Sequence, residues 1–310
     1  KGLEFEWGNM TLTYSNNSTE VQKMAAATLM QAVGYASEMN YSPSASGAVS
    51  YKAMQALIKN FGYGKGIRPI ERDYISLSDF EGIMVDELNA GYPIYYAGRT
   101  KDAGHAFVCD GYNKEGYFHI NWGWGGMSDG YFLTTALGPD AQGIGGADDA
   151  FNYSQAIYTN IRPRTPEDGD YSPLLLSSGA LTSSAKSVEL GGSTRCTLSG
   201  YVFNYGLGDC SFSVGMGIFD EKDEMVTVAK GAAHNIRPYV GNGIAAITVQ
   251  IPSDLKEGTY FIRPVFQLTG TTEWQKISMK VSNPQSILVR VKDNVASFAT
   301  TTYAILKASN

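Results

Sequence analysis

The sequence predicts an α+β domain over residues 1–164, followed by an all-β sandwich domain over residues 165–310. Helical hydrophobic periodicity occurs only in the first third of the chain, and strand-like segments follow it, which is the order typical of α+β domains. Beyond residue 170 we find only short strand-like segments at roughly ten-residue spacing. Between the two patterns, residues 162–170 are polar, contain two prolines and a glycine, and are typical of a linker. A chain of 310 residues is long enough for two domains.

Helices are expected in the first domain wherever apolar residues recur at i, i+3, i+4 and i+7. The first begins at Thr19-Glu-Val-Gln22, which has the form of a capping box, and the third begins at a second such sequence, Ser78-Asp-Phe-Glu81. Glycines and a proline end the second and third helices. The three apolar faces consist of Val21, Met24, Ala25, Thr28, Leu29, Ala32 and Val33, of Met54, Leu57, Ile58 and Phe61, and of Phe80, Ile83, Met84 and Leu88.

Apolar runs bounded by turn residues predict the strands. In the first domain we expect them at residues 92–96, 105–110, 117–122, 130–134 and 155–159. In the second domain we expect them at residues 199–204, 212–219, 245–251, 260–268, 277–281, 287–291 and 298–306. The segment Asp254-Leu-Lys-Glu-Gly-Thr-Tyr260 resembles the corner that precedes a late strand in immunoglobulin-like sandwiches, so this is the type of sandwich that we expect.

The composition argues against several classes of protein. A hydrophobic content of 43% is sufficient for a packed core, and no apolar run approaches the roughly 18–20 residues of a membrane span. A net charge of −6 without a basic block argues against nucleic acid as a partner. The three cysteines, at positions 109, 196 and 210, fit neither a disulfide framework nor a zinc site. We therefore expect free thiols, no metal and no cofactor.

A candidate site gathers at one end of the predicted sheet. A tight turn at residues 113–116 would pair the strands on either side of it, with Tyr112 opposite Tyr117. Continued along both strands, this register places His105 opposite Trp124. The predicted cluster consists of His105, Asn121, Trp122 and Trp124.

An imidazole beside a side-chain amide is suited to acid–base chemistry. The amide oxygen of Asn121 can accept a hydrogen bond from one ring N–H of His105 and fix the tautomer, while the other ring nitrogen takes or holds a proton. Such an amide favours a cysteine nucleophile, because a thiolate–imidazolium pair already carries the charge that Asp supplies in a serine triad. The structural alternative is that His105 only begins a strand and that residues 121–126 form a packed aromatic turn. His119 and His234 are interpreted as structural.

Cys109 is not the expected nucleophile. It follows His105 by four residues on the same strand, which is about 13 Å, and it is interpreted as a buried core thiol. Cys196 and Cys210 belong to the second domain.

The first domain resembles the streptopain family of papain-like cysteine peptidases, which includes interpain-type enzymes. The similarity runs from about residue 5 to residue 162 and is most specific in Gly104-His-Ala-Phe-Val108 and Asn121-Trp-Gly-Trp-Gly-Gly-Met-Ser-Asp-Gly130. Further similar segments are Val21-Gln-Lys-Met24, Tyr41-Ser-Pro-Ser-Ala-Ser-Gly47, Lys59-Asn-Phe-Gly-Tyr63 and Pro93-Ile-Tyr-Tyr96.

The resemblance implies a papain-like fold and endopeptidase activity. It gives His105 the position of the catalytic imidazole, Asn121 the orienting position, and Trp122 and Trp124 the positions of the indoles beside them. It also implies substrate contacts, with Gly104 holding the substrate chain and a small-residue loop forming the cleft wall; a loop that merely leads into a helix is the alternative for that wall. The loop residues are Ser44, Ser46 and Gly47.

In this family the nucleophilic Cys and the oxyanion-hole Gln precede the region where this sequence begins. We therefore expect this chain alone to be inactive, with the Cys supplied by a small N-terminal fragment of the same precursor after maturation of a zymogen. A truncated form of the protein and a true pseudo-peptidase are the alternatives.

The expected function is that of a secreted, cell-surface or periplasmic bacterial cysteine endopeptidase that acts on polypeptides, as a virulence factor would. Two other functions are alternatives: a non-catalytic papain-like and sandwich protein for binding or adhesion, and a different hydrolase, such as a leader-peptide peptidase or a cell-wall amidase. For the second domain, a spacer, a contact surface and an export element are all open.

Overall fold

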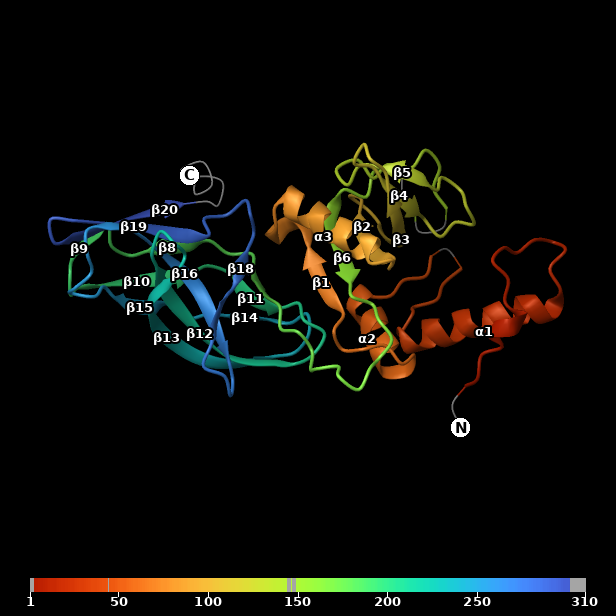
Figure 1. The fold of residues 1–310 in the computed structure, drawn as a ribbon, viewed down its shortest axis with the longest axis horizontal. Helices are drawn as coiled ribbons and strands as arrows, with labels where there is room; N and C mark the ends of the chain where they lie inside the picture. The colour runs from red at the N-terminus through yellow and green to blue at the C-terminus, as the bar shows by residue number, and fades with distance from the viewer. Residues whose placement is uncertain (1–2, 44, 144–145, 147–148, 302–310) are drawn as a thin grey trace.

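The structure is a computed structural model that describes residues 3–43, 45–143, 146 and 149–301. Two regions lie next to each other along the long axis of the molecule: an N-terminal region of helices and one sheet, and a C-terminal region built of strands (Figure 1). No helix in these described ranges is long and apolar enough to cross a membrane. Ser44 and the end of the predicted strand 298–306 lie outside the described residues.

The helices of the N-terminal region form where the periodicity predicts them. The capping box of the first helix is confirmed: the Thr19 hydroxyl accepts from the Gln22 N–H at 3.3 Å, and the Gln22 side chain accepts from the Thr19 N–H at 2.9 Å. The predicted capping box at Ser78 is wrong, because the extended residue before the first turn is Ser76, whose hydroxyl accepts from the Asp79 N–H at 3.1 Å. The helical segments are η1 (Trp7–Asn9), α1 (Glu20–Ala36), α2 (Ser50–Asn60), η2 (Arg72–Tyr74) and α3 (Leu77–Asn89).

The apolar face predicted for α1 is not a buried face. Only Ala25 and Gly34 are buried in this helix, whereas Val21 and Met24 are 57% and 62% exposed. Figure 1 shows α1 extending away from the sheet at one end of the molecule. Val33 is exposed as well, whereas Thr28, Leu29 and Ala32 are half-buried, so this apolar face is only partly covered by the described residues.

One six-stranded sheet forms the centre of the N-terminal region. Its strand order is β1-β6-β2-β3-β4-β5, and β3 pairs antiparallel with both β2 and β4. Phe80 and Met84 of α3 are fully buried in one core with residues of the sheet. The short strand β1 was not predicted, since Pro69 and a length of four residues give it little strand signal. The strands are β1 (Arg68–Glu71), β2 (Ile94–Arg99), β3 (Gly104–Tyr112), β4 (Phe118–Asn121), β5 (Gly130–Phe132) and β6 (Tyr153–Thr159).

The pairing of β3 with β4 differs from the prediction near the turn and agrees with it at the site. Tyr112 pairs with Phe118 rather than with Tyr117. A β-bulge at Asp110 then shifts the register by one residue, so that Val108 pairs with Asn121. Extended beyond the ladder, this shifted register is the predicted one, and the His105 and Trp124 rings do meet.

The C-terminal region is mostly β, with three sheets. Their orders are β15-β10-β8, β14-β11-β7-β18 and β13-β12-β16-β19-β20-β9, with β17 paired to β16. The sequence did not predict the longest strand, β13, because its Ala and Gly residues have low strand propensity. The strands are β7 (Leu175–Ser177), β8 (Leu181–Ser183), β9 (Ser187–Glu189), β10 (Ser193–Leu198), β11 (Tyr201–Asn204), β12 (Cys210–Phe219), β13 (Met225–Ile236), β14 (Gly241–Gly243), β15 (Ile247–Gln250), β16 (Gly258–Leu268), β17 (Trp274–Lys276), β18 (Ser278–Met279), β19 (Ser286–Lys292) and β20 (Val295–Thr301).

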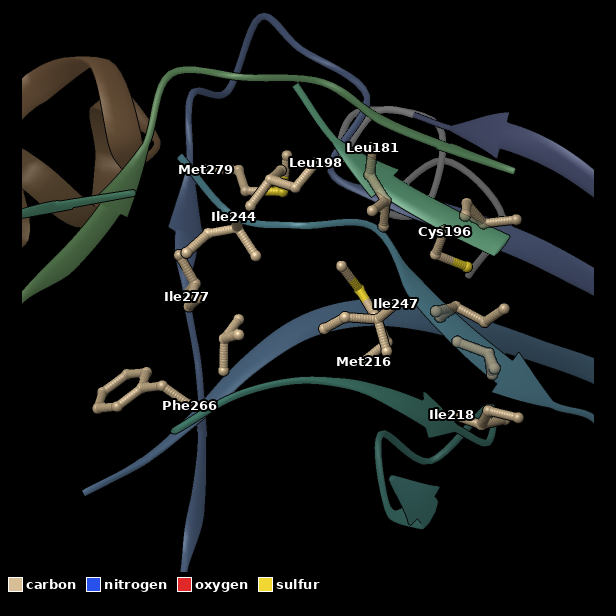
Figure 2. Packing of buried hydrophobic residues seen from close by; sticks show 14 of the residues in the cluster. Leu181, Cys196, Leu198, Met216, Ile218, Ile244, Ile247, Phe266, Ile277 and Met279 are labelled. Carbon is tan, nitrogen blue, oxygen red and sulfur yellow. The ribbon is translucent and has the colours of Figure 1, made fainter. Parts of the chain in front are cut away.

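A single hydrophobic core holds the strands of the C-terminal region together. Figure 2 shows part of it, with Met216 and Ile218 of β12, Ile247 of β15 and Cys196 of β10 within the same cluster. Since these residues come from different sheets, their burial joins the sheets into one body. The immunoglobulin-like type of this region stays a prediction.

The two regions are in direct contact. Gln55 of α2 donates to the Leu207 carbonyl at 2.7 Å, and the hydroxyls of Tyr158 and Tyr239 lie 2.5 Å apart. Leu207 is buried in one cluster with α2. The boundary at residues 164 and 165 stays a prediction.

Candidate active site

His105 stands near the start of β3, at the end of the sheet away from the β3–β4 turn. It pairs with Gly98 of β2, and its side chain is half-buried. Asn121 is the last residue of β4, the neighbouring strand, and the chain then passes through Trp122 and Trp124. The strand pairing thus brings the loop after β4 over the imidazole.

A backbone carbonyl fixes the imidazole. Nε2 of His105 lies 2.8 Å from the carbonyl oxygen of Trp122. A carbonyl oxygen can only accept a hydrogen bond, so Nε2 carries the hydrogen. In the neutral ring, Nδ1 is then the basic nitrogen.

Aromatic rings cover the imidazole. Trp124 stacks on it, with ring centroids 4.7 Å apart and planes inclined by 15°, and Phe151 lies 5.6 Å away. Trp122 is fully buried and stacks against Trp124 at 5.7 Å. This burial lowers the pKa of His105, and the hydrogen bond to the Trp122 carbonyl opposes that effect. The neutral base is therefore favoured.

The structure, which describes both residues, shows no hydrogen bond between the Asn121 side chain and the His105 imidazole. Its Oδ1 accepts from the N–H of Gly123 at 2.9 Å, closing a two-residue Asx turn. Asp129, which lies further along the same loop, accepts with its Oδ1 a hydrogen bond from the Trp122 N–H at 2.9 Å. The structure thus brings His105, Trp122 and Trp124 together, and places Asn121 at the start of the same loop. The catalytic roles of these residues stay predictions.

The predicted substrate-binding residues lie in two places. Gly104 is exposed and precedes His105 in β3. Gly47 and Asn40 exchange backbone hydrogen bonds of 2.9 and 3.2 Å, and Ser46 Oγ accepts from the Ser42 N–H at 3.4 Å. These contacts close the exposed loop before α2, and its role as a cleft wall stays a prediction.

The three cysteines are buried free thiols. Burial raises the pKa of Cys109 and of Cys196 to about 12 and that of Cys210 to about 11. Cys109 faces the sheet core, and its Sγ lies 3.8 Å from the Gly111 carbonyl oxygen. A thiolate is therefore disfavoured at all three positions.

The other histidines have structural contacts. His119 Nδ1 lies 2.6 Å from Asp110 Oδ1, which ties β4 to the bulge in β3. His234 packs on Phe212 in the C-terminal region, with ring centroids 5.6 Å apart. In the described ranges, no group of three or more His, Cys, Asp or Glu side chains is placed to hold a metal ion.

Two residues of the site were missed by sequence reasoning. Phe151 precedes a predicted strand, and only the tertiary fold brings it against His105. Asp129 lies within the segment that carries the resemblance, and an acidic residue seven positions after an aromatic one at a glycine-rich turn was its only signal.

Comparisons with known proteins match the N-terminal half of the chain. Residues 1–132 match the model of the Peptidase C10 family. Streptopain of Streptococcus pyogenes is 42% identical over 160 residues, which are 52% of this chain and 40% of streptopain. The thiol protease/hemagglutinin PrtT of Porphyromonas gingivalis is 35% identical over 166 residues, which are 54% of this chain and 19% of that protein. The solved structure of active wild-type interpain A from Prevotella intermedia is 36% identical, with a TM-score of 0.46, and covers 51% of this chain and 64% of its own.

The sequence matches place the N-terminal half in the class of the cysteine proteases. More narrowly, this half of the chain belongs to the Peptidase C10 (streptopain/interpain) family. The chain spans 40% of the length of streptopain, and the residues that the family model matches end at 132.

Proposed function

We propose that the protein is a secreted cysteine endopeptidase in which His105 is the catalytic base. The observation that carries this proposal is the setting of the His105 ring: Nε2 is held by the Trp122 carbonyl at 2.8 Å under the Trp124 indole. This leaves Nδ1 as the nitrogen that can exchange a proton with a nucleophile and a leaving group. Membership of the N-terminal half in the Peptidase C10 family supports the reaction class.

The nucleophilic thiolate comes from a residue outside these 310, on a fragment of the same precursor. The three cysteines of the chain support this proposal, since all are buried and their raised pKa values disfavour thiolates. The exposed apolar face of α1 supports it too, because a further segment would cover Val21 and Met24. Without that fragment, the chain by itself is inactive.

In the reaction, the thiolate attacks the peptide carbonyl carbon while the His105 imidazolium lies beside it. Nδ1–H of His105 then gives its proton to the leaving amine as the C–N bond breaks. Water attacks the resulting thioester, Nδ1 takes its proton, and the thiolate leaves. The polypeptide substrate is contacted by Gly104 and by the loop of Ser44, Ser46 and Gly47, and we propose an apolar side chain on the N-terminal side of the cleaved bond.

The C-terminal region is proposed to be an immunoglobulin-like sandwich that serves as a contact surface. The hydroxyl of Tyr260 donates to the Lys256 carbonyl at 3.1 Å, as the tyrosine of such a corner does. The antiparallel pairing of β12 with β16 and of β16 with β19 is compatible with this type.

The test uses the full-length protein as its gene encodes it. His105→Ala is expected to lower kcat/KM on a peptide substrate by roughly 10³-fold or more. The matched variant His119→Ala, on the neighbouring strand, is expected to keep most of the activity because His119 contacts Asp110 rather than the site. An active His105→Ala protein would overturn the proposal.

The origin of the thiolate is tested separately. A variant with Cys109, Cys196 and Cys210 all replaced by Ala is expected to stay active and to remain sensitive to iodoacetamide. Mass spectrometry is expected to find the alkyl group on a cysteine outside these 310 residues. An inactive triple variant that is still folded, or alkylation of Cys109 in the wild-type protein with parallel loss of activity, would contradict the assignment.

A further inference from the structure

One peptide group contacts both His105 and Asn121. The carbonyl oxygen of Trp122 accepts from His105 Nε2 at 2.8 Å, and the N–H of Gly123 donates to Asn121 Oδ1 at 2.9 Å. These two atoms belong to the same peptide bond. Because that group is planar, the carbonyl cannot turn without moving the N–H. Asn121 therefore holds the plane in which the acceptor for His105 lies.

The preceding peptide group is held as well. The Trp122 N–H donates to Asp129 Oδ1 at 2.9 Å. The two peptide groups on either side of the Trp122 Cα thus each donate a hydrogen bond to a side-chain oxygen. One oxygen belongs to Asp129, seven residues later in the chain, and the other to Asn121, the residue before Trp122. The Trp122 side chain is fully buried in the sheet core, and this burial holds the Cα between the two peptide groups in place.

We propose that Asn121 and Asp129 are positioning residues that act on His105 through the backbone of Trp122. The proposal rests on the proposed function only in taking His105 as the base. Neither side chain touches the imidazole; together they keep the Trp122 carbonyl aimed at Nε2. This keeps the hydrogen on Nε2 and leaves Nδ1 free for the proton transfers.

The chemistry of the chain of bonds supports this role. An N–H that donates to a side-chain oxygen polarises its own peptide group and makes the carbonyl of that group a better acceptor. A better acceptor strengthens the bond from Nε2–H and favours the imidazolium. Loss of the Asn121 oxygen is therefore expected to weaken the hold on the Nε2–H tautomer and to lower the pKa of His105.

The experiment measures the tautomer and the pKa of His105 directly. In full-length protein labelled with ¹⁵N-histidine, long-range ¹H–¹⁵N spectra distinguish Nε2–H from Nδ1–H, and the spectrum of His105→Gln assigns the signals of this ring. For Asn121→Ala and Asp129→Ala we expect a larger Nδ1–H population and a pKa lower by roughly half a unit. In the same variants kcat/KM is expected to fall roughly 3- to 10-fold, mainly through kcat. Asn121→Asp and Asp129→Asn keep an acceptor oxygen and are expected to restore the tautomer.

Two matched controls remove similar turns elsewhere. Asn113 Oδ1 accepts from two backbone N–H groups in the turn between β3 and β4, and Asp220 Oδ1 does the same between β12 and β13. Asn113→Ala and Asp220→Ala are expected to leave the His105 tautomer unchanged. A shift in these controls equal to that in the site variants would overturn the proposal.

The results separate this proposal from the proposed function. A His105 tautomer that is unchanged in a folded Asn121→Ala protein overturns the positioning role, even where His105→Ala abolishes activity. If Asn121→Ala shifts the His105 tautomer but the wild-type full-length protein has no peptidase activity, the result supports the positioning role and contradicts the proposed function. Asn121 is exposed, so its variant is expected to fold and carries the test even where Asp129→Ala does not.

Discussion

Two neighbours of His105 act on its pKa in opposite directions. Burial under the aromatic rings lowers the pKa, and the Trp122 carbonyl raises it. The net effect is a pKa of His105 below its ordinary value, and the ring has a fixed donor at Nε2. A nearby thiolate would favour the charged ring and raise the pKa of His105. The thiolate and the burial of the ring therefore shift this pKa in opposite directions.

Replacement of the stacked indole tests this balance. Trp124→Ala uncovers the ring, so the burial effect weakens and the pKa of His105 is expected to rise towards 6.5. An NMR titration of the ring measures the shift. Its sign is opposite to the one expected for Asn121→Ala. Trp7→Ala, at an exposed site outside the sheet, serves as control. A lower pKa in the Trp124→Ala protein would contradict the account of burial.

At this scale the sequence predicts side chains better than backbone. The meeting of His105 with Trp124 followed from strand pairing and is confirmed. The acceptor for Nε2 is a carbonyl, which every residue carries, so no residue type marks it. Asn121 was expected to bind the ring directly because amides often do so; in the structure its oxygen reaches the Gly123 N–H two residues on.

The loop after β4 depends on glycines with positive φ. Gly123, Gly125 and Gly126 have φ of 77°, 67° and 92°, in the left-handed region that costs other residues about 1–2 kcal/mol. These turns let the chain reverse within a few residues and return Asp129 to the Trp122 N–H. The loop thus sets both the acceptor and the cover of His105.

Matched alanine substitutions test this element. A Cβ on Gly125 meets no atom within 4 Å, so Gly125→Ala is expected to destabilise by about 1 kcal/mol through φ alone. Gly82, in α3, also has open space around it and helical backbone, so Gly82→Ala is expected to stabilise by about 1 kcal/mol. Urea unfolding measures both changes. A stabilising Gly125→Ala would show that the loop does not hold this conformation.

Registers show how far the sequence determines an element. The strands β3 and β4 were predicted from apolar runs, but the predicted pairing is wrong by one residue near the turn. Only the bulge at Asp110 returns the two strands to the predicted register at the site. Turn residues fix the local pairing near the β3–β4 turn, whereas the register at the site follows only after the bulge. Long-range pairing of this kind is not encoded in a single window of sequence. The start of α3 was predicted two residues too late, because Ser76 and Ser78 are both of a residue type that caps helices and the sequence does not distinguish them.

On the scale of the whole molecule, the sequence predicts two regions and not how they meet. The junction is rich in tyrosine: Tyr239 stacks on Tyr51 at 4.3 Å and bonds to Tyr158. Lys280 pairs with Asp73 at 2.8 Å, and the Val281 N–H donates to the Asp73 carbonyl at 2.9 Å. These residues lie far apart along the chain and show no periodicity, so their meeting follows only from the folded surfaces.

Glu71 gives this junction a pH dependence. It lines a cavity of about 710 Å³ between the two regions, and burial, strengthened by the Asp73 carboxylate and opposed by Lys280, raises its pKa to about 8. The group faces further ionisable side chains, namely Tyr74, Tyr158, Tyr205 and Tyr239. At neutral pH the folded protein therefore holds a proton on Glu71 that the unfolded chain, with a pKa near 4.5, releases.

The sign of the effect follows from this proton. Between about pH 4.5 and pH 8 the folded state binds one proton more at Glu71, so the free energy of unfolding falls as the pH rises, by at most about 1.4 kcal/mol per pH unit. Glu71→Gln cannot release a proton, and this fall is expected to be absent from its unfolding curves at pH 5 and pH 8. The variant is then more stable than the wild type at pH 8, whereas Glu189→Gln, at an exposed position in β9, keeps the wild-type pH dependence. Because Glu71 lies where the two regions meet, a wild-type slope in the Glu71→Gln protein would mean that the junction is open to water in solution.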